Sequence, residues 1–287
     1  MDADKTAMTD LSRDIHRFIE DHRWVTGGDL IRRFGRDPDG GCYGDENLLL
    51  APEVSHGTAD AICSLYDAGE ITIELISPIV YLLDGIAVDL PYAGELKGYA
   101  TPHWFPAAFC STAVTERIRT TSRFPAGTGL PEKSPRLGWQ QWLMKSQEQF
   151  RCRRCGDCCE DTAIVDLNWY DMERIAVHLN IGMDEMVDRY TVEMPEERMR
   201  ALPYLFPLRG IRETLPCMFF DRATRGCSIY PVRPLVCRAF PYLETITVYS
   251  HPETFNFGGC YAVKEYFDRI RAELGTGRHR SDGQRTV

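Results

Sequence analysis

Eight of the eleven cysteines in this 287-residue chain belong to one region. Four of them form a single C-x2-C-x2-C-C motif: Cys152, Cys155, Cys158 and Cys159. The other four follow later in the chain: Cys217, Cys227, Cys237 and Cys260. Thiolates two residues apart on a tight turn can converge on one metal ion, and the intervening Gly156 lets backbone N–H groups turn towards the sulfurs. We therefore predict that these eight thiols are ligands of a metal centre.

The spacing favours iron–sulfur over zinc. A C-x2-C-x2-C run matches the start of the bacterial ferredoxin motif, although the next cysteine is adjacent and the expected C-x3-C-P is missing. Four-thiolate sites suit both metals, but zinc sites usually show paired C-x2-C knuckles, and only one end of this constellation has them. We expect a [4Fe–4S] cluster, with zinc as the alternative.

The adjacent pair Cys158 and Cys159 bears on the number of centres. Side chains at successive extended positions point to opposite faces, so these two thiols are not expected to bind one metal atom in the same way. Eight thiols suffice for two four-cysteine sites, or for one site with additional core thiols. The sequence leaves both arrangements open.

Two arginines flank the later cysteines, namely Arg233 and Arg238. Guanidinium groups beside a thiolate cluster would offset its negative charge and donate hydrogen bonds to sulfur, and both effects tune the reduction potential. The alternative is that they bind an anionic group of a substrate or cofactor. Pro231 and Pro234 restrict the backbone and would fix the approach of Cys237.

The cysteine region resembles the CxxCxxCC family of zinc- or iron-chelating proteins. The resemblance covers about residues 150–260 and rests on Phe150-Arg-Cys152-x2-Cys155-Gly156-x-Cys158-Cys159, then Cys217-Met-Phe-Phe220, then Cys227-Ser-Ile-Tyr230-x2-Arg233-Pro234-x2-Cys237-Arg238-x-Phe240-Pro241. It implies a metal centre, often described as iron–sulfur, without a settled common reaction. The cysteine pattern is also similar to that of flagellin lysine methylase, which implies a cluster that supports protein methylation.

The cysteines outside this region, Cys42, Cys63 and Cys110, are expected to be core thiols. The high density of cysteines in residues 152–260 indicates metal binding rather than disulfides, if the compartment is reducing. The N-terminus lacks the basic and apolar regions of a signal peptide. The strongest apolar run, residues 75–83, is far shorter than the ~20 residues that span a bilayer. We expect a cytoplasmic protein outside the membrane.

The first 90 residues predict an acidic, winged-helix-like domain. Apolar periodicity indicates helices over residues 9–23, where Thr9 or Asp10 can cap, and over residues 56–67. A second, short helix is expected over residues 26–34, ended by Gly35. The Asp- and Gly-rich residues 36–47 predict a loop, and residues 71–83 predict two strands around a Ser77-Pro78 turn. Three helices followed by a β-hairpin is the order of a winged helix-turn-helix.

The remaining chain divides into three parts. Residues 91–149 predict a proline-rich surface connector that ends in a helix. Residues 150–274 predict a small, loop-rich, metal-stapled domain with a strand over 162–167, helices after Asn168, over 184–190 and over 261–274, and mostly turns over 203–241. Residues 275–287 predict a disordered tail. The whole chain is therefore expected to be α+β.

The acidic charge of the N-terminal part indicates which class of partner the chain can bind. Residues 1–100 hold 8 Lys and Arg against 19 Asp and Glu. Phosphate contacts dominate DNA affinity and require cations, so nucleic acid is disfavoured and another protein is the expected partner. Three hypotheses follow: an iron–sulfur protein with a redox or protein-modification role, a cluster-containing winged-helix regulator that senses redox state or iron, and a structural zinc module that mediates protein contacts.

Overall fold

The computed structural model describes residues 9–112, 150, 152–156, 159–160, 165–194, 209–211, 216–240, 262–266, 268–269 and 272. The α+β class is confirmed, since helices and short β-sheets occur in both halves of the chain. Within these ranges, no helix has the length and apolar character needed to cross a bilayer.

Three of the predicted N-terminal helices are confirmed: α1 (Asp10–His22), α2 (Gly27–Phe34) and α3 (His56–Asp67). Local capping explains where each begins, because the side chains of Thr9, Thr26 and Ser55 accept hydrogen bonds from backbone N–H groups of the first turns. The buried residues Ile15 and Ile19, four apart, face α1 towards the core.

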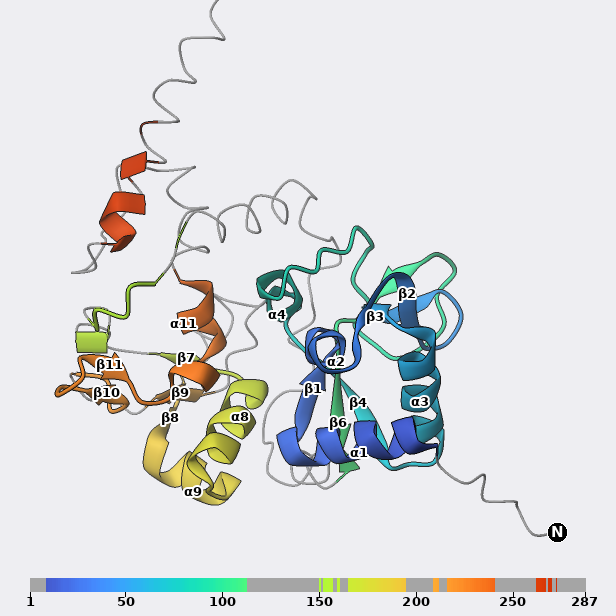
Figure 1. Cartoon of the computed structure of the whole chain (residues 1–287), viewed down its shortest axis with the longest axis horizontal. Coiled ribbons are helices and arrows are strands. Elements are labelled where there is room, and N and C mark those ends of the chain that lie inside the picture. Colours follow the sequence, from blue (N-terminus) through green and yellow to red (C-terminus); the bar gives the residue numbers. More distant parts are fainter. Residues whose placement is uncertain are drawn as a thin grey trace, which may run out of the picture.

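Two three-stranded sheets accompany these helices. The first has the order β1–β6–β4 and is antiparallel, with strands β1 (Trp24–Thr26), β6 (Ala107–Ser111) and β4 (Ile71–Leu75). The second has the order β2–β3–β5, with strands β2 (Arg36–Tyr43), β3 (Leu48–Val54) and β5 (His103–Trp104). Figure 1 shows both sheets in the blue-to-green half of the chain.

The predicted hairpin around Ser77-Pro78 is wrong in its second strand. Residues Pro78–Leu83 form helix α4, in which proline occupies the first turn and Ser77 Oγ accepts a hydrogen bond from Ile79 N at 3.3 Å. Proline is favoured at the start of a helix because its missing N–H would have no helical partner there. The strand that pairs with β4 is β6, some thirty residues later.

The predicted loop over residues 36–47 is also wrong, because its first part is strand β2. This strand lies at the edge of its sheet and pairs antiparallel with β3 through an irregular register. Four of its eight residues are exposed, so Asp and Pro are tolerated there and the apolar alternation of a strand is missing.

Part of the predicted surface connector is core. Within residues 91–112, strands β5 and β6 complete the two N-terminal sheets, and the Trp104 and Phe109 side chains are fully buried. The surface interpretation is therefore wrong for residues 103–111. The predicted helix over 138–149 lies outside the described residues.

The C-terminal half is built from short elements. Helix α8 (Trp169–Leu179) and helix α9 (Met183–Tyr190) confirm two predictions, and Asn168 and Asp171 form a reciprocal capping box at the start of α8. The remaining elements are β7 (Asp166–Leu167), β8 (Thr191–Glu193), β9 (Arg209–Ile211), β10 (Phe220–Asp221), β11 (Gly226–Cys227), the 3-10 helix η2 (Tyr230–Val232) and α11 (Leu235–Ala239). Residues 262–266 are helical, within the predicted final helix.

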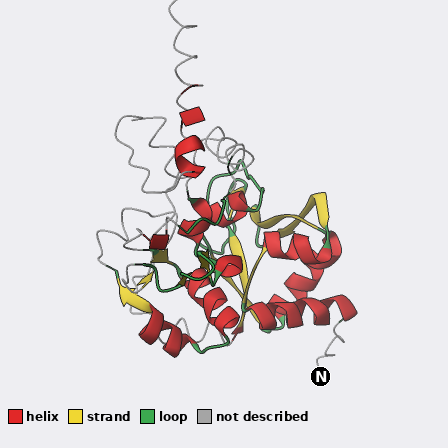
Figure 2. Cartoon of the chain, turned by 60° about the vertical axis from the view of Figure 1, so that its left-hand side comes forward, coloured by secondary structure: helices red, strands yellow, loops and turns green. Residues whose placement is uncertain are grey.

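The described residues bury two apolar clusters. One lies wholly within the N-terminal half, between α1, α3 and the sheets. The other combines N-terminal residues such as Trp24, Val80 and Trp104 with C-terminal residues such as Met172 and Ile175. Helix α8 packs beside β1, as Figure 1 shows, and Figure 2 shows helices on either side of the long central strands. The two halves therefore share a core.

Candidate metal centre

Six of the eight predicted ligands lie within the described residues. Cys152 is exposed, and five thiols are partly buried: Cys155, Cys159, Cys217, Cys227 and Cys237. Cys158 and Cys260 lie outside the described residues. Partial burial suits thiolates that bind metal, since the site excludes bulk water while solvent still reaches one side.

A short hairpin positions Cys217 and Cys227. Strands β10 and β11 pair Phe220 with Cys227, and Phe220 N donates to Cys217 O at 2.8 Å. The connecting loop is held by Asp221, whose carboxylate accepts from Ala223 N at 2.9 Å and from the Thr224 hydroxyl at 2.7 Å. This tight turn brings two cysteines ten positions apart to the same small element.

The first cysteine motif docks on that hairpin. Cys217 N donates to Cys159 O at 2.7 Å, and the Arg225 guanidinium pairs with the Glu160 carboxylate at 3.1 Å. Gly156 permits the approach: its φ is +85°, and a Cβ there would meet Phe220 Cε2 at 2.4 Å. The structure thus brings Gly156, Cys159 and Glu160 of the first motif against the later Cys217–Cys227 segment, while ligation by these cysteines stays a prediction.

Tyr230 ties the first motif to the segment that leads to Cys237. The guanidinium of Arg154 lies 4.0 Å from the centroid of the Tyr230 ring, and that of Arg233 lies 4.1 Å from it. Arg233 Nη1 also donates to Tyr230 O at 3.1 Å. Arg233, predicted to lie beside the cluster, therefore packs on the aromatic ring between the two segments. Its contact with sulfur stays a prediction.

A buried carboxylate positions α11, the helix that carries Cys237. Asp171 Oδ1 accepts a hydrogen bond from Leu235 N at 2.8 Å and so caps the first turn of α11. Burial raises the pKa of Asp171 to about 6, against the lowering effect of its hydrogen bonds from Leu235 and Asn168. The same residue completes the capping box of α8, so one carboxylate fixes α11 relative to α8.

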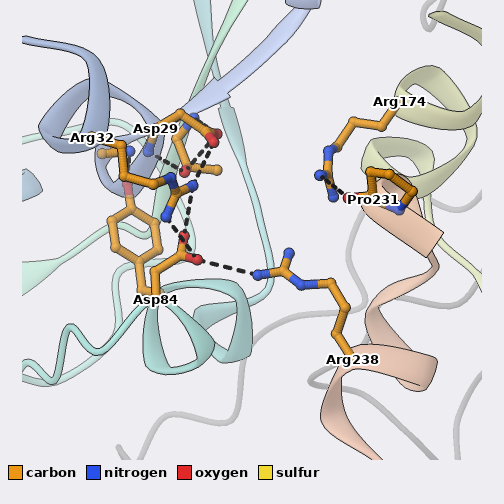
Figure 3. A network of polar contacts seen from close by, with 9 residues as sticks. Asp29, Arg32, Asp84, Arg174, Pro231 and Arg238 are labelled. Carbon is orange, nitrogen blue, oxygen red and sulfur yellow. Dashed lines mark hydrogen bonds and ion pairs between the residues drawn. The ribbon is translucent and has the colours of Figure 1, made fainter. Parts of the chain in front are cut away.

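Arg238, the residue after Cys237, pairs with the N-terminal half. Its Nη2 lies 3.1 Å from Asp84 Oδ1, and Arg32 Nη1 lies 3.0 Å from the same oxygen. Arg32 also pairs with Asp29 at 2.6 Å. Figure 3 shows this chain of charges running from α2 through the end of α4 to α11. The predicted role of Arg238 beside the cluster stays a prediction, while its contact with Asp84 places α11.

The three other cysteines differ from one another. Cys42 and Cys110 are fully buried, as predicted for core thiols. Cys63 is exposed on α3, so its assignment to the core is wrong. It occupies the solvent side of an amphipathic helix, whose buried side is formed by Ala59, Ile62 and Leu65.

The donor set suits a metal of the predicted kind. Thiolates are soft ligands, and soft ligands select zinc and iron–sulfur clusters. Among the described residues, no three His, Cys, Asp or Glu side chains stand close enough together to hold an ion. The six described candidate ligands belong instead to chain segments that contact one another through Gly156, Cys159, Arg225 and Tyr230.

Sequence reasoning missed the residues that position these segments. Asp171 had a detectable signal, since Asn168 followed three residues later by Asp171 is a capping pattern. Glu160, Arg225 and Asp84 had none, because their partners lie far away in the sequence.

Comparison with known proteins agrees with the cysteine pattern. Residues 151–256 match the family CxxCxxCC, described as "Putative zinc- or iron-chelating domain". An uncharacterized protein of Methanocaldococcus jannaschii is 33% identical over 93 residues, which is 32% of this chain and 44% of that relative. The chain thus matches less than half of that relative's length. No solved structure matches the chain. Residues 151–256 are therefore similar to the CxxCxxCC family, whose description is that of a zinc- or iron-chelating domain and supports metal binding by this segment.

Proposed function

We propose that the cysteines of residues 152–260 hold an iron–sulfur cluster of the [4Fe–4S] type, with zinc as the alternative, and that the protein serves a redox or protein-modification role. The ligands would come from Cys152, Cys155, Cys158, Cys159, Cys217, Cys227, Cys237 and Cys260. When bound, such a cluster supplies one-electron chemistry. Thiols of this kind stay reduced in the cytoplasm, which is the location we propose.

One observation carries this proposal. The first motif packs directly on the hairpin of Cys217 and Cys227, through the Cys217 N to Cys159 O hydrogen bond and the close approach at Gly156. Ordinary core thiols need no such arrangement. A metal centre does, because its ligands must come from segments distant in sequence.

The chain's own residues prepare the surroundings of a negatively charged group. The guanidinium groups of Arg154 and Arg233 both pack on the Tyr230 ring. They lie in the segments that carry the proposed ligands. Fixed positive charge near thiolates lowers the cost of their ionisation and raises the reduction potential of a cluster. Asp171 and Asp84 hold α11, and with it Cys237, in place.

We propose that the N-terminal half serves as a winged-helix-like module used for protein contact. Helices α1, α2 and α3 accompany the sheet β1–β6–β4, in which the last two strands follow α3 in sequence. Helix α3 contains no Lys or Arg and exposes Asp60 and Asp67. A surface of this charge repels DNA phosphates, so we propose another protein as the partner of this module.

Iron, zinc and acid-labile sulfide measured on anaerobically purified protein test the proposal. We expect iron and sulfide in comparable amounts, with broad visible absorption. Stoichiometric zinc in a colourless protein would select the zinc alternative, and protein without bound metal would contradict both.

A matched pair of variants then tests the site. Cys155→Ser should lose most of the metal, since it removes a predicted ligand from the first motif. Cys63→Ser, on the exposed side of α3, should retain it. Equal metal content in the two variants would remove Cys155 from the ligand set.

A further inference from the structure

A second pair of thiols lies in the N-terminal half, outside the metal-binding domain. Cys42 is on β2 and is fully buried, whereas Cys63 is on α3 and is exposed. Helix α3 packs on β2, which places the Cys63 thiol beside that of Cys42. Cys63 Sγ also lies 3.9 Å from Tyr43 O, the residue next to Cys42. The pair therefore combines one accessible sulfur with one buried sulfur in contact with it.

The contact activates the accessible thiol. The hydrogen bond from Cys42 lowers the pKa of Cys63 to about 7, against the raising effects of partial burial and of the carboxylates of Asp67 and Asp60. The same contact and burial raise the pKa of Cys42. Thiolate is the nucleophilic form of cysteine. Cys63 thus has the properties of an attacking thiol and Cys42 those of a resolving thiol.

We propose that Cys42 and Cys63 form a redox-active dithiol, which a small neutral hydroperoxide oxidises to an intramolecular disulfide. The proposal does not depend on the metal centre, because both residues lie on elements of the N-terminal half.

The reaction balances in two steps. The Cys63 thiolate attacks one oxygen of the hydroperoxide, the O–O bond breaks, and the leaving alkoxide or hydroxide takes up a proton, which leaves a sulfenic acid on Cys63. The Cys42 sulfur then attacks the Cys63 sulfur, and the departing hydroxide takes the Cys42 proton and leaves as water. Two thiols lose two electrons in total, and the hydroperoxide gains them.

The surroundings of Cys63 select the oxidant. Asp60 and Asp67 lie one helical turn away on either side in sequence, and both are exposed. Their charge repels anionic oxidants such as the disulfide of glutathione, whereas hydrogen peroxide is uncharged. Cys110 shows the contrast, because burial raises its pKa well above the usual value and keeps it from solvent.

Peptide mapping of the full-length protein after treatment with one equivalent of hydrogen peroxide tests the proposal. We expect a linked peptide pair that contains Cys42 and Cys63 and is lighter by two hydrogens than the two reduced peptides. Mapping reads these two positions separately from the cysteines of residues 152–260, so loss of metal does not affect the result. Absence of the linked pair, with both thiols still alkylated, would overturn the proposal.

Variants identify the roles of the two thiols. Cys42→Ser should accumulate a Cys63 sulfenic acid that dimedone traps, and Cys63→Ser should leave Cys42 reduced. If dimedone labels Cys63 as strongly in the unsubstituted protein as in Cys42→Ser, then Cys42 does not react with the Cys63 sulfenic acid. A mixed disulfide at Cys63 with oxidised glutathione, formed faster than the peroxide product, would overturn the choice of oxidant.

Alkylation of the unsubstituted protein needs no variant. The thiolate fraction of Cys63 rises as its pKa falls, while the nucleophilicity of each thiolate declines, so the net gain at pH 7 is about fivefold over an ordinary thiol. We expect Cys63 to react with iodoacetamide about fivefold faster than an ordinary thiol at pH 7, with the midpoint of its pH–rate profile near pH 7. Cys110 should stay unlabelled. A Cys63 midpoint of 9 would contradict an activated pair.

Discussion

At the scale of single residues, Gly156 decides whether the first cysteine motif can dock. Its backbone has φ +85°, and a Cβ would meet Phe220 Cε2 at 2.4 Å and Arg225 O at 2.8 Å. Gly156→Ala should therefore cost about 2 to 4 kcal/mol, because it adds a left-handed backbone penalty to an overpacked contact. Urea unfolding measures the loss, and metal content should fall with it.

Gly182→Ala is the matched control for that prediction. Gly182 precedes α9 with an ordinary φ of −76°, and a Cβ there would meet nothing within 4 Å. The control should leave stability and metal content close to those of the unsubstituted protein. If both glycine variants behave alike, the approach of the two cysteine segments at Gly156 is not important for the site.

Asp171 gives a pH prediction. Its pKa of about 6 in the folded chain lies above the ordinary value of 3.8, because it is buried. The folded state therefore binds this proton more tightly, and the contribution of Asp171 is greatest below pH 4 and falls as the pH rises to 6. The loss is on the order of 3 kcal/mol.

Asp171→Asn tests this direction, since asparagine keeps an acceptor for Leu235 N without a charge. Relative to the unsubstituted protein at equal metal content, the variant should gain stability as the pH rises from 4 to 6.5. Free energies of unfolding from urea titrations at several pH values measure the difference. Parallel pH curves would contradict a buried carboxylate that ionises at a cost.

At the scale of elements, Asp84 joins three helices. It follows α4, accepts from Arg32 of α2 and from Arg238 of α11, and its side chain is only 6% exposed. Asp84→Asn leaves two guanidinium groups without their shared anion, and we expect a loss of about 2 to 3 kcal/mol, discounted for the exposure of Arg32.

The exposed pair of Glu95 and Lys97 supplies the control, because solvent screens it. Glu95→Gln should not change the free energy of unfolding measurably. A double-mutant cycle with Arg238→Gln separates the contact of Asp84 with α11 from its contact with α2. A coupling energy of zero in that cycle would mean that Arg238 does not hold α11 against the N-terminal half.

Elements with local signals were predictable from the sequence. Helices α1, α2, α3 and α8 were predictable because apolar periodicity, end signals such as Gly35 and caps such as Thr9 and Asn168 are properties of neighbouring residues. The misses have equally local reasons. Pro78 starts a helix where a turn was expected, and β2 is a half-exposed edge strand without apolar alternation.

The candidate site was predictable by residue type and not by arrangement. Cysteine spacing indicated the family and supplied candidate ligands, but the contacts that bring their segments together join distant residues, such as Glu160 with Arg225 and Cys159 with Cys217. The activated pair of Cys42 and Cys63 shows the same limit, because a pairing between a strand and a helix leaves no mark on the local sequence.

At the scale of the whole molecule, one apolar cluster contains residues of both halves. Trp24 of β1 lies against Tyr170 of α8, with ring centroids 6.3 Å apart. We therefore predict that β6 and α8 lose protection from hydrogen exchange at the same urea concentration, since a shared core unfolds as a unit. Exchange mass spectrometry measures both, and earlier opening of α8 would mean that the two halves unfold independently.

We propose above all that sulfur atoms from separate segments of residues 152–260 surround one metal centre. X-ray absorption at the metal edge of the anaerobically purified protein tests it most directly. We predict a first shell made of sulfur alone, with metal–metal scattering if the centre is a cluster and with Zn–S distances of about 2.3 Å if it is zinc. A first shell of oxygen and nitrogen without sulfur would contradict the account.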